Sequence, residues 1–216
     1  DDDHDAELET LIEVLDKQKI LENKNEIRLL FRLISKIADN HHRSSDFFDK
    51  LEKIFQYLIK DIPTPISYFN PDYTKYNKRI LFLLLEKGFV KPDETFLNQY
   101  LQIKQNIPQI FYYLYPKMKE FLDEKLQKQI EEEISKKYSE TISSFEEKCQ
   151  IGENDSYICS LIRTDSVEDF IIYVNRTNLS LSMKIKRSIY ETHSFLIDKE
   201  PSLIEYATFY GSIQII

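Results

Sequence analysis

The sequence predicts an all-α protein. Only three of its 216 residues are glycine, at Gly88, Gly152 and Gly211. Tight hairpin turns need positive φ angles, which glycine adopts most readily, so a hairpin-rich sheet would need more glycine than this. Apolar residues also recur at spacings of three and four, the period of a helix with one buried face. Because 42% of the residues are hydrophobic, the chain has enough apolar surface to fold.

Three helices are predicted in the first 60 residues. The first has apolar residues at 8–21, and Asn25 caps the second, whose inward side chains lie at 27–38. Polar residues at 39–42 end the second helix, and Ser44 or Ser45 caps a third with apolar residues at 47–59. Short polar links of this kind are typical of antiparallel neighbours in a helical bundle.

Prolines interrupt this helical pattern over residues 62–76. The same segment contains Tyr68, Tyr73 and Tyr76, and we expect either a structured loop or a surface that meets a partner. Helical periodicity resumes at 78–87 and stops at Gly88, which we expect to serve as a C-cap glycine.

An aromatic segment follows the next predicted helix, which opens at 92–95. Pro108 precedes it, and we expect it to end at Pro116. Its members are Phe111, Tyr112, Tyr113, Leu114 and Tyr115. Five consecutive apolar or aromatic residues cannot all face one core from one helix, so either they are buried on several sides or one face is exposed. Because tyrosine is enriched at binding hot spots, a candidate partner surface consists of Tyr68, Tyr73, Tyr76, Phe111, Tyr112, Tyr113 and Tyr115.

Residues 117–149 predict one long charged helix or a pair of helices. Apolar residues recur every four positions from 118 to 142, and such a stripe drifts around a helix. We therefore expect a bend or a break rather than a strict heptad seam. Assembly as a coiled coil through 117–149 is an alternative. Gly152 closes this part of the chain.

The chain beyond 150 has a different pattern. Two short helical runs, 155–163 and 167–174, precede an inserted loop at about 175–200, and a further apolar pattern runs from 203 to 216. We expect an N-terminal helical domain at 1–150 and a second unit at 151–216. Because the pattern stops without a polar end, we expect the natural protein to continue past Ile216.

The segment 202–211 resembles the first helix and turn of an ankyrin repeat. Ile204 occupies the position of the repeat's leucine, Ala207 its first alanine and Gly211 its turn glycine. Leu203, Glu205 and Thr208 depart from the usual proline, histidine and second alanine. Residues 157–174 resemble a more degenerate helix pair of the same kind.

Longer stretches extend this resemblance to most of the chain. Residues 151–163, 189–197 and 203–215, together with 40–43 and 78–81, are similar to a protist family in which an uncharacterised helical domain precedes ankyrin repeats. The resemblance implies an α-solenoid, a stack of helical hairpins with degenerate ankyrin-type repeats after an N-terminal helical domain, truncated within a repeat. It also implies that the partner is another protein, and the family supplies no active site to transfer.

Charge and hydropathy exclude two classes of partner. With 29 basic and 37 acidic residues the net charge is −8, which disfavours binding to nucleic-acid phosphates. No apolar stretch approaches the roughly 20 residues that span a bilayer, so we expect no membrane segment and a cytoplasmic location. The sequence does not begin with methionine, so an N-terminal signal could have been removed.

The sequence contains no recognisable catalytic or metal-binding motif. Cys149 and Cys159 form neither a disulfide framework nor a zinc pattern, and we expect two buried thiols. His41 and His42 are adjacent in a turn and do not share a helical face, and we assign no metal site to them. We therefore expect a non-enzymatic interaction module without catalytic residues, metal or cofactor. The alternative is a helical ligand-binding or enzymatic domain with a pocket near the aromatic segments.

Overall fold

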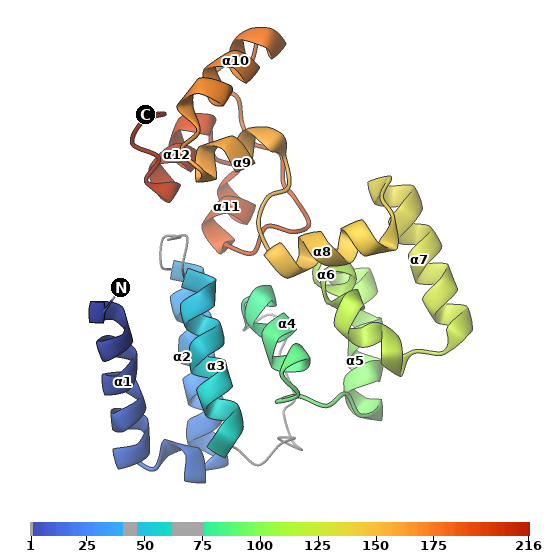
Figure 1. Cartoon of the computed structure of the whole chain (residues 1–216). Helices are drawn as coiled ribbons and strands as arrows, with labels where there is room; N and C mark the ends of the chain where they lie inside the picture. The colour runs from blue at the N-terminus through green and yellow to red at the C-terminus, as the bar shows by residue number, and fades with distance from the viewer. Residues whose placement is uncertain (1, 41–46, 62–75) are drawn as a thin grey trace.

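The computed structural model describes residues 2–40, 47–61 and 76–216, and in these residues the protein is all-α, as predicted. The described residues form twelve α-helices and two short 3₁₀ segments, without a β-strand (Figure 1). An isolated antiparallel bridge joins Lys184 and Ser202. Within these residues, no helix combines the length and the apolar character that crossing a bilayer would need.

Three helices form the N-terminal part, as their amphipathic stripes predict. They are α1 (Asp2–Lys17), α2 (Lys24–Asn40) and α3 (Phe47–Asp61), with a 3₁₀ segment at Ile20–Glu22, and they lie side by side in Figure 1. Phe31 of α2 and Phe55 of α3 are buried and stack with ring centroids 5.8 Å apart. The predicted capping residues Ser44 and Ser45, His41 and His42, and the tyrosines Tyr68 and Tyr73 lie outside the described residues.

Helix α4 (Lys78–Glu86) is buried along most of its length. Its first seven residues are all buried, and it packs against α6 and α2. A helix that is apolar all round belongs in a core, which explains the run of apolar residues at 80–85. Asn77 caps its N-terminus, and Gly88 follows its end with φ of 73°.

Helices α5 (Glu94–Asn106) and α6 (Pro108–Met118) pack against each other as a hairpin. Asp93 caps α5 by accepting a hydrogen bond from the Phe96 amide, and the Tyr100 ring stacks on Phe111 at 4.6 Å. The aromatic segment ends at Pro116, but α6 continues to Met118 with Pro116 inside it. The break comes in the 3₁₀ segment Lys119–Phe121, so proline is tolerated here close to the end of the helix.

Residues 117–149 form a helix pair, the second of the two predicted arrangements. Helix α7 (Glu124–Tyr138) and α8 (Ile142–Ile151) are separated at Ser139, which has φ of 56°. Thr141 then caps α8 by accepting a hydrogen bond from the Ser144 amide. The positive φ of Ser139 ends the first helix and the Thr141 cap begins the second, so the apolar stripe is divided between two helices.

Four short helices follow Gly152: α9 (Tyr157–Arg163), α10 (Val167–Thr177), α11 (Ser194–Lys199) and α12 (Leu203–Tyr210). Helix α9 packs against both α10 and α12, and these helices share a hydrophobic cluster distinct from the main one. The main cluster runs to Cys149 and also includes Ile189 and Tyr190, whereas the second cluster begins at Ile158. The predicted loop at about 175–200 is shorter than expected, because α10 extends to Thr177 and six residues of the loop form α11.

Helices α9 and α12 begin and end alike, 46 positions apart. Ser156 and Ser202 are their N-cap residues. The Ser166 amide donates to the Leu161 carbonyl, and the Ser212 amide donates to the Ala207 carbonyl, both at 3.0 Å. The residue before each of these serines has positive φ, 50° at Asp165 and 68° at Gly211.

Candidate functional site: a buried polar junction

Polar side chains that are rarely buried gather where the N-terminal helices meet the C-terminal ones. They come from the start of α4, from the loop after α8 and from the segment before α11. The buried members are Asn77, Lys78, Arg79, Asn154, Glu191, Thr192 and His193. Buried polar groups cost free energy unless they are paired, so their partners define what this junction can do.

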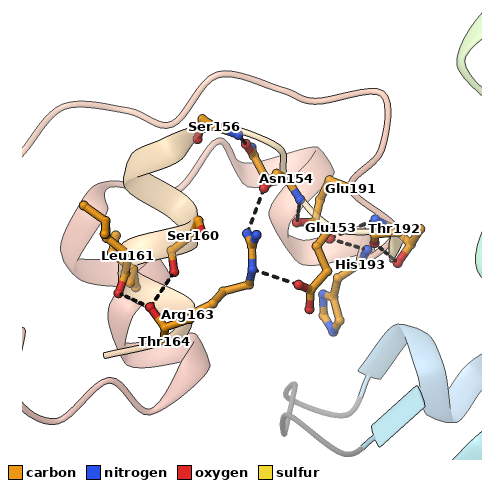
Figure 2. A network of polar contacts seen from close by, with 12 residues as sticks. Glu153, Asn154, Ser156, Ser160, Leu161, Arg163, Thr164, Glu191, Thr192 and His193 are labelled. Carbon is orange, nitrogen blue, oxygen red and sulfur yellow. Dashed lines mark hydrogen bonds and ion pairs between the residues drawn. The ribbon is translucent and has the colours of Figure 1, made fainter. Parts of the chain in front are cut away.

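The Glu191 carboxylate organises the segment before α11. It accepts hydrogen bonds from the backbone amides of Thr192 at 2.8 Å, His193 at 2.9 Å and Asn154 at 3.3 Å. The Thr192 hydroxyl donates to the Gly152 carbonyl at 2.8 Å. These bonds join the loop after α8 to a segment almost 40 residues later (Figure 2).

Arg163 of α9 extends this network into the C-terminal helices, as Figure 2 shows. Its Nη1 donates to the Asn154 carbonyl at 2.8 Å and to the Tyr206 hydroxyl of α12 at 3.0 Å. Its Nε lies 2.8 Å from Glu153 Oε2. Burial opposes the charge of Arg163, but Tyr206 and Glu153 beside it raise its pKa above the usual value.

The first residues of α4 bind the junction to the N-terminal helices. The Asn77 side chain accepts from the Arg79 amide and donates to Asp39 Oδ1 at 2.7 Å and to the Thr192 carbonyl at 2.6 Å. Lys78 Nζ donates to the Ile189 carbonyl. Burial lowers the pKa of Lys78 to about 8, although the nearby Glu191 opposes this shift.

Arg79 is held by aromatic rings instead of acceptors. Its guanidinium carbon lies 5.2 Å from the Phe48 ring and 5.5 Å from the Phe82 ring. Its Nε and Nη1 are buried and have no hydrogen-bond partner among the residues that the structure describes.

Gly152 allows the backbone after α8 to lie close to the side chains of Arg79 and Tyr113. It has φ of 74°, and a Cβ atom there would lie 3.2 Å from both Arg79 Cδ and the Tyr113 hydroxyl oxygen. Both the backbone angle and the space therefore favour glycine.

The two cysteines and His193 occupy structural positions. Both cysteines are buried, and burial raises the pKa of Cys159 to about 11 and that of Cys149 further, so both stay protonated near neutral pH. His193 Nδ1 accepts from the Phe195 amide at 3.2 Å and so caps α11. Across the described ranges, no group of three or more potential metal ligands is found.

The aromatic segment lies in the core, which is the burial alternative that the sequence left open. Phe111, Tyr112, Tyr113 and Tyr115 are buried, and so is Tyr76. Their hydroxyls have partners within the fold: Tyr112 donates to Glu133 at 2.9 Å, Tyr113 to the Cys149 carbonyl at 2.8 Å, and Tyr115 to Glu131 at 3.0 Å. Burial and Glu133 raise the pKa of Tyr112 to about 12.

A cavity of about 610 Å³ adjoins the junction. Lys78 and Thr192 line its junction side, and Tyr76, Lys137 and Tyr138 line other parts of its wall. It combines apolar walls with cationic and hydroxyl groups, which is the mixture found in many ligand sites.

The sequence contains one local signal for the junction. Asn77, Lys78 and Arg79 directly precede the longest apolar run of the chain, so polar groups at the start of a buried helix were to be expected there. Glu191 carries no comparable local signal, because its partners come from another segment. Comparison with protein-family models, with curated proteins and with solved structures finds no match for this chain.

We predict that Gly152→Ala destabilises the protein more than Gly88→Ala does. Both glycines have positive φ, but a Cβ at Gly88 meets nothing within 4 Å, so Gly88→Ala reports backbone strain alone, about 1 kcal/mol. Gly152→Ala should cost at least about 1 kcal/mol more, because Arg79 and Tyr113 must shift. Urea unfolding measures both, and equal losses would show that the junction is not tightly packed at Gly152.

We also predict that Lys78 makes stability depend on pH. Its pKa is about 8 when folded and 10.5 when unfolded, so between these values the unfolded chain binds more protons and stability rises with pH. The slope is at most about 1.4 kcal/mol per pH unit. Urea unfolding at several pH values from 7.5 to 9.5 should show wild type gaining stability relative to Lys78→Met. Parallel profiles for the two proteins would contradict the assignment.

Proposed function

We propose that this chain is a non-enzymatic protein–protein interaction module whose C-terminal helices are built on a two-helix repeat of the ankyrin type. The support comes from the like geometry of α9 and α12. The positions of their N-cap serines, their closing turns and the first bond of the following turn coincide, although the Ser202 side chain forms a capping box and the Ser156 side chain makes no capping bond. In the following turns the Phe170 amide donates to the Ser166 carbonyl at 2.9 Å, and the Ile216 amide donates to the Ser212 carbonyl at 3.2 Å. Such agreement is what successive repeats would produce.

Contacts between the two closing turns support the same proposal. The Gln214 amide donates to both oxygens of the Asp165 carboxylate at 3.2 Å, and the Ser212 hydroxyl donates to the Ile162 carbonyl at 2.5 Å. The turn after α12 is therefore in register with the turn after α9, as neighbouring units in a stack would be.

Residues at equivalent positions of α9 and α12 differ in their exposure to solvent, and this difference supports the proposed function. Ile158 of α9 is 6% exposed, whereas Ile204, its equivalent in α12, is 52% exposed. Ile162 is likewise buried and its equivalent Thr208 is exposed. Helix α12 packs against α9. We infer that this packing covers Ile158 and Ile162, whereas the equivalent face of α12 exposes Ile204 and Thr208. We assign this open face as the binding surface for a helical partner.

The aromatic residues first considered as a partner surface contribute to this function indirectly. Tyr76 and the segment 111–115 are buried, so they stabilise the scaffold. We therefore assign partner binding to α12 instead of to these residues. A second candidate function is ligand binding in the 610 Å³ cavity beside Lys78, whose lining includes three cationic residues, Lys78, Lys137 and Arg187, and two acidic ones, Asp39 and Asp198. Screening a panel of small organic acids for a rise in melting temperature that Lys78→Met abolishes would support it.

We predict that Ile204→Lys weakens partner binding by at least about tenfold, because a charge would enter the contact. A partner would first be captured from a cell extract on the immobilised chain, identified, purified and then titrated. Ile151→Lys is the matched control, since Ile151 of α8 is also 52% exposed. Equal effects of the two variants, or turnover of a small molecule without any protein partner, would overturn the proposal.

An added unit should stabilise the chain if α9 and α12 are successive repeats. Appending residues 171–216 a second time after Ile216 should raise the free energy of unfolding by about 1–2 kcal/mol, because a copy of α12 would cover Ile204. Urea unfolding measures the gain, and the same extension carrying Ile204→Lys should lose it. Appended residues that stay unfolded by circular dichroism would contradict the repeat assignment.

A further inference from the structure

A second exposed apolar surface lies on α1 and α2. It consists of Leu11 and Val14 of α1 and Leu29, Leu33 and Ile37 of α2. Leu29 and Leu33 are each 55% exposed, and with Ile37 they follow a spacing of four along one side of α2. Single exposed apolar residues are ordinary, but five on two neighbouring helices mark an interaction surface.

An apolar groove of about 310 Å³ accompanies this surface. Leu11, Leu33 and Ile37 belong both to the exposed set and to the groove wall, and Phe47 and Ile54 of α3 line its far side. Among the described residues that line the groove, Lys50 is the one that carries a charge. The surface is therefore a shallow depression into which apolar side chains of another helix could pack.

Charge is distributed unequally between the two helices. Residues 1–17 contain eight acidic residues and one lysine, so they carry seven of the eight net negative charges of the chain. On α2, by contrast, Arg28, Arg32 and Lys36 each precede one member of the apolar stripe Leu29, Leu33 and Ile37. The apolar surface is thus bounded on one side by α1, whose described residues include Glu9 and Glu13, and on the other by a cationic row.

We propose that α1 and α2 form a self-complementary interface between two copies of this chain. The apolar stripes meet at the centre, and the acidic α1 of each copy lies along the cationic row on α2 of the other. A two-fold axis along the helices produces this pairing, since each surface then meets its own copy. An axis that placed α1 of one copy against α1 of the other would bring like charges together. Charge complementarity therefore favours the arrangement in which α1 lies along α2 of the other copy.

This interface is independent of the open face of α12, because it uses other helices and another kind of complementarity. Its four helices would form a bundle of the common antiparallel type around an apolar centre. A helix of a different protein on the same groove is the alternative occupant, and it predicts a monomer when the chain is alone.

Sedimentation of the full chain over a wide range of concentration tests the proposal. We expect a species of twice 25.9 kDa that dissociates on dilution. Leu29→Glu/Leu33→Glu should be monomeric, and Ile171→Glu/Ile172→Glu on α10, with similarly exposed residues, should still dimerise. Circular dichroism verifies that each variant is folded.

A charge-swap pair tests the arrangement itself. Glu9→Lys/Glu13→Lys and Arg32→Glu/Lys36→Glu should each weaken self-association by at least about tenfold, because attraction becomes repulsion. An equimolar mixture of the two variants should restore the dimer, since both contacts are attractive again. A chain that is monomeric at all concentrations, a dimer that survives Leu29→Glu/Leu33→Glu, or a mixture that associates no better than its components would overturn the proposal.

Discussion

The structure depends on one buried carboxylate, that of Glu191. Its three backbone donors fix the segment before α11, and that segment in turn accepts hydrogen bonds from Asn77 and Lys78 through the carbonyls of Thr192 and Ile189. A buried carboxylate is costly unless its lone pairs are satisfied, so this conformation is strongly specified. The α4 end of the N-terminal part and the C-terminal helices therefore share one polar connection.

This connection sets the position of the surfaces that we assign to binding. Arg163 links the loop after α8 to Tyr206 of α12, so α12 is held relative to the junction by a charged side chain whose Nη1 and Nε both have partners. Helix α1 lies on the side of α2 and α3 that faces away from α4 (Figure 1). One scaffold can thus present the two distinct faces that we propose for binding.

The helices could be predicted from the sequence because their signals are local. Apolar spacing located α2 and α3, and Asp93, Gly88 and Gly211 act at helix ends as expected. The six-residue α11 could not be found by periodicity, since it is too short and a histidine caps it. The junction could not be predicted either, because the partners of Glu191 come from another segment and from its own backbone. The aromatic segment 111–115 was ambiguous for a similar reason: α5, α7 and α8 supply the contacts of its side chains.

Hydrogen exchange in Glu191→Gln tests the central claim most directly, since this change keeps the shape of the side chain and removes its charge. If the carboxylate holds the C-terminal helices to the rest of the chain, amides at 184–193 and in α9 and α12 should exchange faster together. The amides of α5 and α6 should keep the exchange rates of the wild type. Unchanged exchange at 184–193, or a uniform increase over the whole chain, would contradict this account.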